Sequence, residues 1–198
     1  MMGSSECEVK AGVIAQPLIK VGRVASRVVL RSITCNVARQ YEKMIVDCVY
    51  LGNASIEYSL EGESLSWANV GGYADAMKNK PIGLSGEMGS CPAYLYRSVG
   101  CEVMVGQRYE QPVCLYCYPN GTSDYTYLYL LTTIGDRKYY YRVPLDKGLE
   151  SNRSSGVDVV ITNLGADSPV DGDIQKGEIK ATISIEDWLM GYQYDAEF

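Results

Sequence analysis

Residues 178–185 read EIKATISI, and this stretch decides the fold class of the chain. The apolar residues Ile179, Ala181, Ile183 and Ile185 alternate there with polar or charged ones. Successive side chains of a β-strand point to opposite faces of its sheet, so a period of two predicts a strand with one buried face. A strand buries a face only as part of a sheet, so other segments of the chain should form strands that pair with this one.

Further strands are predicted wherever runs rich in apolar, aromatic and β-branched residues lie between turn signals. A hairpin is expected across Gly135-Asp136, and residues 56–60 are expected to pair with the strand at 44–51. The glycine-rich residues 61–89 are predicted to be a long connection. Many short strands favour an all-β sandwich, here in two halves that meet near residue 108. The predicted strands cover residues 24–35, 44–51, 94–96, 102–105, 112–118, 125–134, 138–143, 157–162 and 178–185.

The composition excludes several classes of function. The 198 residues carry a net charge of −6, which provides no overall field to attract the phosphates of nucleic acid. The chain has no histidine, which rules out Ser-His-Asp and Cys-His catalysis and imidazole ligands for zinc. No nucleophile, base and orienting group can be named together, so we expect neither an enzyme nor a nucleic-acid partner.

The seven cysteines leave at least one thiol unpaired in any intramolecular pairing. Cys114 and Cys117 have the spacing of redox dithiols and zinc sites, but residues three apart in a strand point to opposite faces. We therefore expect them to be structural, while a disulfide between Cys91 and Cys101 remains open. The acidic pairs Asp171 and Asp173, and Glu186 and Asp187, lack the rest of a calcium loop, so we expect no metal and no cofactor.

Tyrosine is the compositional outlier, with 17 residues against one phenylalanine. A tyrosine-rich surface can stack on sugars or bases, and residues 125–141 hold many of these rings. No basic stripe accompanies them, so we expect the rings to cover an antiparallel sheet.

An ordered set of segments carries a resemblance to a known family. Most lie in the second half of the chain, and one lies near its start. They are residues 21–33 (VGRVASRVVLRSI), 115–120 (LYCYPN), 138–145 (KYYYRVPL), 157–162 (VDVVIT), 177–188 (GEIKATISIEDW) and 192–198 (YQYDAEF). Together they resemble the fimbrillin family, the type V pilus subunits and related surface adhesins of Gram-negative anaerobes.

The resemblance implies two transthyretin-like β-sandwich domains with an Ig-like Greek-key topology. Residues 1–107 would form an N-terminal domain shortened at its start, and residues 108–198 a C-terminal domain with a terminal strand segment. It also implies export as a lipoprotein, attachment to the outer membrane through a lipid anchor, and removal of an N-terminal strand by an arginine-specific protease. Arg23 and Arg27 fall inside the matched motif, and neither is assigned as the processing site.

The resemblance further implies polymerisation by strand donation, with other pilus subunits as partners and a surface protein or glycan as a further target. The segment that matches the donated region holds the candidate partner-binding residues Ile179, Ala181, Ile183, Ile185 and Trp188. An alternating segment can add to the edge of another sheet, or it can be the last strand of its own domain. The alternative function is a non-polymerising, surface-exposed lipoprotein module that binds carbohydrate or protein.

Overall fold

The structure is a computed structural model that describes residues 12, 22–52, 54–55, 95–119, 126–145, 149–167 and 179–188. These residues form nine strands and one short 3₁₀ turn, η1 (Arg39–Tyr41). Within these ranges no helix has the length and apolar character needed to cross a membrane. The strands are β1 (Ser26–Cys35), β2 (Lys43–Gly52), β3 (Tyr96–Met104), β4 (Arg108–Tyr109), β5 (Val113–Cys117), β6 (Tyr127–Ile134), β7 (Arg137–Pro144), β8 (Arg153–Ile161) and β9 (Ile179–Asp187).

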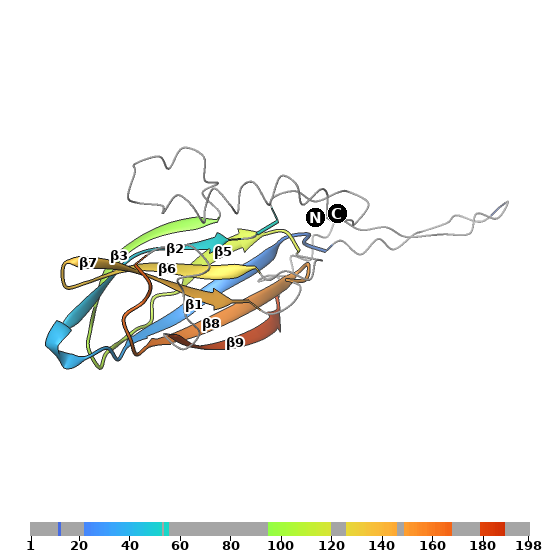
Figure 1. Ribbon diagram of the computed structural model, residues 1–198. Helices are drawn as coiled ribbons and strands as arrows, with labels where there is room; N and C mark the ends of the chain where they lie inside the picture. The colour runs from blue at the N-terminus through green and yellow to red at the C-terminus, as the bar shows by residue number, and fades with distance from the viewer. Residues whose placement is uncertain are drawn as a thin grey trace.

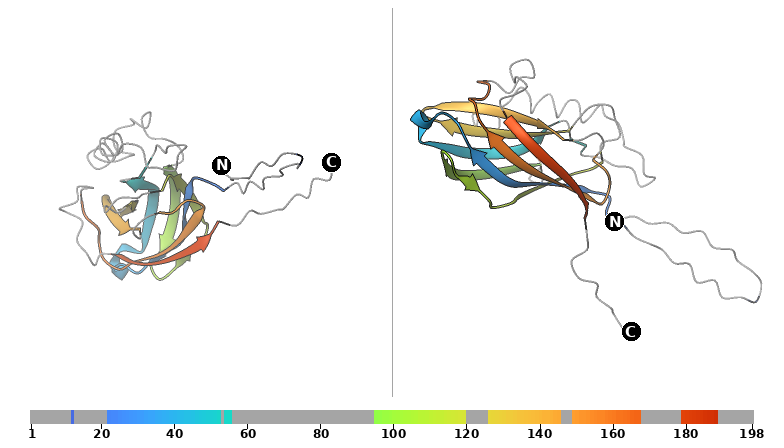
Figure 2. Two further views of the ribbon diagram at one scale, coloured as in Figure 1. Left: turned by 90° about the vertical axis from the view of Figure 1, so that its right-hand side faces the viewer. Right: turned by 90° about the horizontal axis from the view of Figure 1, so that it is seen from below.

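The strands form two sheets that pack face to face as a sandwich (Figures 1 and 2). Sheet I has the order β4-β1-β8-β9, with β5 beside the first half of β1, and sheet II has the order β3-β2-β6-β7. Strands β1 and β8 run parallel, and every other described pair of strands is antiparallel. This arrangement confirms the predicted all-β sandwich.

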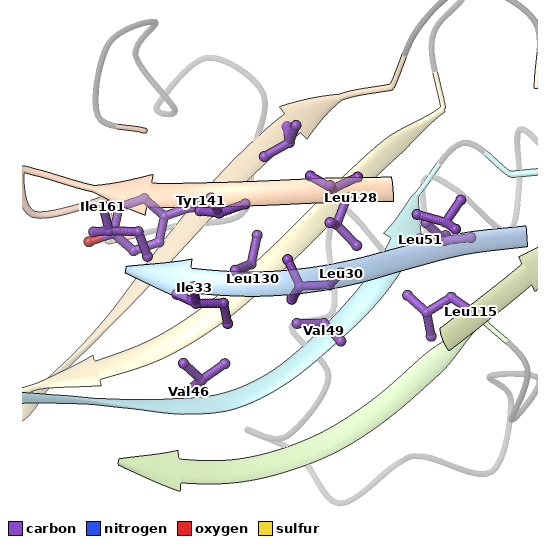
Figure 3. Close-up of a cluster of buried hydrophobic side chains, with 14 of the residues drawn as sticks. Leu30, Ile33, Val46, Val49, Leu51, Leu115, Leu128, Leu130, Tyr141 and Ile161 are labelled. Atoms are coloured by element: carbon purple, nitrogen blue, oxygen red, sulfur yellow. The ribbon is translucent and has the colours of Figure 1, made fainter. Parts of the chain in front are cut away.

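Apolar side chains from both sheets meet between them and form the core (Figure 3). Register shifts in β1, after Leu30, and in β2, after Val46, interrupt strict alternation. The shift in β1 lets Leu30 and Ile33 both enter the core although they are an odd number of residues apart. Central members of the core are Leu30, Ile33, Val46, Val49, Leu51, Leu115, Leu128, Leu130, Tyr141 and Ile161.

The outer face of sheet II carries a second apolar cluster, as expected for tyrosines that cover an antiparallel sheet. Tyr50 and Tyr129 stack in parallel with their ring centres 5.0 Å apart, and Tyr140 joins them; each is about 1% exposed. Gly52 lies beneath the Tyr129 ring, where a β-carbon would collide with it. Burial, together with nearby Cys48 and Asp47, raises the pKa of Tyr140 to about 12, so its hydroxyl stays neutral.

Most of the predicted strands are confirmed with small shifts at their ends. The hairpin across Gly135-Asp136 is present as β6 and β7. The two strands predicted at 94–96 and 102–105 are one continuous strand, β3, because Gly100 adopts a positive φ of 63° and the chain continues through it. Residues 56–60 and 61–89 lie outside the described ranges, so the hairpin and the long connection predicted there stay predictions.

Strands from both sides of the expected boundary between residues 107 and 108 pair within each sheet. In sheet I, β1 pairs with β5 and β8, and in sheet II, β2 pairs with β6. Their side chains share one core cluster. The described residues therefore form one sandwich, and the expected count of two domains is not confirmed.

Candidate functional site

Strand β9 contains four of the five candidate partner-binding residues, and it lies at an edge of sheet I. It pairs antiparallel with β8 along its whole length, from Ile179 opposite Ile161 to Asp187 opposite Arg153. Among the strands that the structure describes, β8 is the one partner of β9. In Figures 1 and 2 the strand runs along the rim of the sandwich.

The apolar face of β9 is incompletely covered. Its four apolar residues lie opposite Ile161, Val159, Val157 and Ser155 of β8, which turn their side chains inward, so they share the inner face of the sheet. Ile179 and Ile183 pack partly buried against the core. Ala181 is exposed, and Ile185 is 52% exposed. The backbone ladder to β8 therefore holds β9 more than side-chain burial does.

Trp188, the fifth candidate residue, anchors the end of β9 to the start of β1. Its backbone N–H donates to the Asn152 carbonyl at 2.9 Å, and its carbonyl accepts from Arg23 Nη1 at 3.0 Å. The Arg23 and Arg27 guanidinium carbons lie 4.7 and 5.1 Å from the centre of its ring. Tyr116 of β5 stacks near the same indole, with ring centres 5.7 Å apart. Trp188 thus links β9 to β1 and β5.

A charged network covers the outer face of sheet I next to this anchor. Asp158 of β8 pairs with Arg31 and, at 3.3 Å, with Arg108, and it accepts a hydrogen bond from Ser32 at 2.5 Å. Partial burial raises the pKa of Asp158, but the hydrogen bonds from Ser32 and Arg31 and the charges of both arginines outweigh it. The pKa of this carboxyl therefore lies below its ordinary value, and Asp158 stays ionised.

The described cysteines offer no reactive thiol pair. Cys35, Cys101, Cys114 and Cys117 carry free thiols. Cys114 and Cys117 lie on opposite faces of β5, as predicted, with Cys117 buried and Cys114 partly exposed. Burial raises the pKa of the Cys117 thiol to about 12, which keeps it protonated and unreactive. Cys91, whose disulfide with Cys101 the sequence leaves open, lies outside the described residues.

No group of histidine, cysteine or acidic residues suited to a metal ion occurs in the described part of the chain. Of the acidic pairs noted in the sequence, Asp171 and Asp173 lie outside that part. Glu186 and Asp187 are in β9, where Asp187 pairs with Arg153 and Glu186 lies 3.9 Å from Arg31. These two acids therefore belong to the surface charge network.

Sequence reasoning missed the arginines and the tyrosine around Trp188 as a group. One signal for part of the group is present, because Arg23 and Arg27 are four residues apart in the sequence and residues four apart in an extended segment share a face. Their meeting with Trp188 joins residues as far as 165 positions apart, which no local pattern contains.

Comparison with known proteins identifies the fold. No protein-family model matches the sequence, and no curated protein sequence matches it. Among the solved structures that share the fold are a putative cell adhesion protein from Bacteroides eggerthii (TM-score 0.58, 17% identity), a fimbrilin from Porphyromonas gingivalis W83 (0.56, 15%) and a second putative cell adhesion protein, from Parabacteroides distasonis (0.56, 13%).

These matches cover 94%, 93% and 87% of this chain, respectively. The chain in turn spans 62%, 65% and 54% of the three matched chains, less than two thirds of each. The expected likeness to fimbrillins is therefore confirmed at the level of the fold. The part played by the five candidate residues in binding a partner stays a prediction.

Proposed function

We propose that this chain is a non-enzymatic cell-surface adhesion protein, a fimbrial subunit or a pilus-associated adhesin, whose β9 segment takes part in strand exchange between subunits. The observation that carries the proposal is the position of β9 at the edge of sheet I with Ala181 and Ile185 exposed. The fold shared with a fimbrilin and with proteins named for cell adhesion supports it.

Strand exchange at this edge would leave the number of backbone hydrogen bonds unchanged. A β9 segment from a second subunit would re-form the same backbone ladder on β8, so the hydrogen bonds lost by one copy are regained from another. Ile179 and Ile183 fix the register, since a slip of one residue would turn both away from the core. Little apolar burial opposes departure of the strand, because half of its inward-facing residues are exposed.

The proposal extends to location and partners. The chain would be displayed at the cell surface, exported as a lipoprotein and attached to the outer membrane through a lipid anchor. Its partners would be other pilus subunits of the same kind, with a surface protein or glycan as a further target. It would need no cofactor and no metal.

The test is exchange of a labelled peptide of residues 177–190 into the full-length chain. A matched variant, V160C/K180C, places two thiols at directly opposed positions of β8 and β9, so a disulfide would lock the resident strand. We expect saturable binding to the unmodified chain, loss of binding to the oxidised variant, and recovery on reduction. A peptide with Ile179 and Ile183 replaced by lysine should not bind.

Equal peptide binding by the oxidised and the reduced variant would contradict exchange at the β8 edge. Failure of the peptide to bind any form would make β9 an ordinary closing strand. A chain that stays monomeric, exchanges no strand and binds a glycan or protein would favour the alternative, a non-polymerising surface module.

A further inference from the structure

Arg23 and Arg27, at the start of sheet I, differ from the other arginines on this surface because no carboxylate of the described residues pairs with them. Arg31, Arg108 and Arg153 on the same surface each pair with at least one carboxylate. Arg23 and Arg27 have no carboxylate within 4.0 Å among the described residues; their hydrogen bonds go to the Trp188 carbonyl and the Ser154 hydroxyl.

Both arginines contact the same aromatic ring. Both guanidinium groups lie over the Trp188 indole, and the Tyr116 ring stacks near the same indole. The Arg27 Nε–H donates to Ser154 Oγ at 3.0 Å, which fixes the guanidinium and leaves its two terminal nitrogens without a described partner. A ring quadrupole offsets only part of the repulsion between two like charges. The arrangement is therefore complementary to an added anion.

The oxygens of a carboxylate or sulfate group suit this arrangement. Guanidinium groups present paired N–H donors that match two oxygens of such a group, and these charge-assisted hydrogen bonds are stronger than neutral ones. Half-buried Trp188 and Tyr116 offer apolar ring surface beside the charges, which is the kind of surface that packs against a sugar ring.

The place of the site in the sheet disfavours a peptide ligand. Over residues 27–30, β1 pairs with β5 on one side and β8 on the other, so this part of the strand has no free backbone edge. A peptide could not add to this part of β1 as a strand, so a ligand would meet the side chains of Arg27 and Tyr116 there. We propose that Arg23, Arg27, Trp188 and Tyr116 form a binding site for the carboxylate or sulfate group of an acidic saccharide.

The test uses three short dextran oligosaccharides of one length: neutral, carboxymethylated and sulfated. The full-length W67F variant leaves Trp188 as the one tryptophan, so its fluorescence and its indole N–H resonance report on the site directly. We expect one or both charged oligosaccharides to bind and to shift both signals, and the stronger of the two identifies the anionic group. The neutral oligosaccharide should bind at least about tenfold more weakly.

Two double variants, R23Q/R27Q and R108Q/R153Q, distinguish binding at this site from general electrostatic attraction. Each of them removes two positive charges from the surface of sheet I. We expect R23Q/R27Q to lose about a hundredfold in affinity, from two lost charge-assisted contacts, and R108Q/R153Q less than about threefold. The variant R23K/R27K, which keeps the charge and loses the forked donors, should fall between them. Thermal unfolding shows whether each variant is folded.

Equal losses in the two glutamine variants would overturn the proposal, since a general field would then explain binding. Equal affinity for the neutral oligosaccharide would overturn the role of the anion, and tighter binding of a polyglutamate peptide would overturn the saccharide class. Should R23Q/R27Q fail to fold, an unchanged Trp188 resonance in W67F on saturation would still refute the site. None of these results depends on strand exchange, so the proposed function is tested separately.

Discussion

Strands β6 and β9 have almost the same length and yet differ in nearly everything else. β6 lies between β2 and β7 in sheet II, and six of its eight residues are buried. β9 pairs with β8 over nine residues, and not one of its residues is buried. Hydrogen-bond register therefore places a strand in a sheet, whereas coverage of its two faces determines how firmly it is held.

The largest effect that would sharpen this comparison is the loss of a core side chain in β6. Leu130 is fully buried, so Leu130→Ala should lower the free energy of unfolding by about 3 kcal/mol, through lost transfer energy and a cavity. The matched change Ile185→Ala in β9 should cost less than about 0.5 kcal/mol, because that side chain is half exposed. Urea unfolding of both variants measures the difference, and similar costs would break the comparison.

Amide hydrogen exchange would compare the same two strands without a mutation. Because little apolar surface is lost when β9 separates from β8, its amides should exchange through local opening, about a hundredfold faster than those of β6. Mass spectrometry of peptic fragments or NMR gives both rates in one sample. Equal protection in the two strands would mean that β9 opens only with the whole sandwich.

Glycine positions extend the comparison to the two outer faces. A β-carbon at Gly52 would collide with the buried Tyr129 ring, so Gly52→Ala should destabilise the chain by about 2 kcal/mol. At Gly156 a β-carbon would meet the guanidinium of Arg31, the far end of a flexible side chain. Gly156→Ala should therefore cost less than about 1 kcal/mol. Thermal unfolding ranks the two variants, and the reverse order would show that sheet I is the more rigid face.

The smallest expected effect concerns the charge of Asp158, next to β9. Its pKa is held below the ordinary value of 3.8, so its ionised form adds stability above pH 4 that is lost as pH falls through the lowered pKa. Asp158→Asn should be less stable than the unmodified chain at pH 7, and the gap should narrow as pH approaches 3. Urea unfolding at pH 7, 5 and 3 measures it; a constant gap would mean that Asp158 acts through packing alone.

The sequence predicts the strands well because alternation and turn residues are local signals. The pattern around Ile179, Ile183 and Ile185 and the Gly135-Asp136 turn placed β9 and the β6–β7 hairpin correctly. The two-residue strand β4 was missed, since two residues are too few for a period. The register shift after Leu30 breaks the period in β1, so alternation alone gave the strand and not its full set of core residues.

Long-range arrangement was beyond the reach of local patterns. Nothing in residues 27–35 indicates that β1 pairs in parallel with β8, because either direction satisfies a strand with one buried face. The sequence also did not predict the exposure of Ile185. Its place in the alternating pattern predicts a buried side chain, whereas its position at the edge of sheet I leaves it half exposed. Arg23 and Arg27 meet Trp188 because β1 pairs with β8 and because β9 follows β8 at the edge of sheet I.

The parallel pairing of β1 with β8 has a consequence for how the chain folds during synthesis. Arg27 and Ser154, which face each other across this pair, are 127 residues apart, so β1 leaves the ribosome long before β8 exists. Until then its apolar positions cannot reach that central partner, and high contact order of this kind slows folding and prolongs exposure to aggregation. A nascent chain that stops before residue 153 would therefore be a client for holdase chaperones.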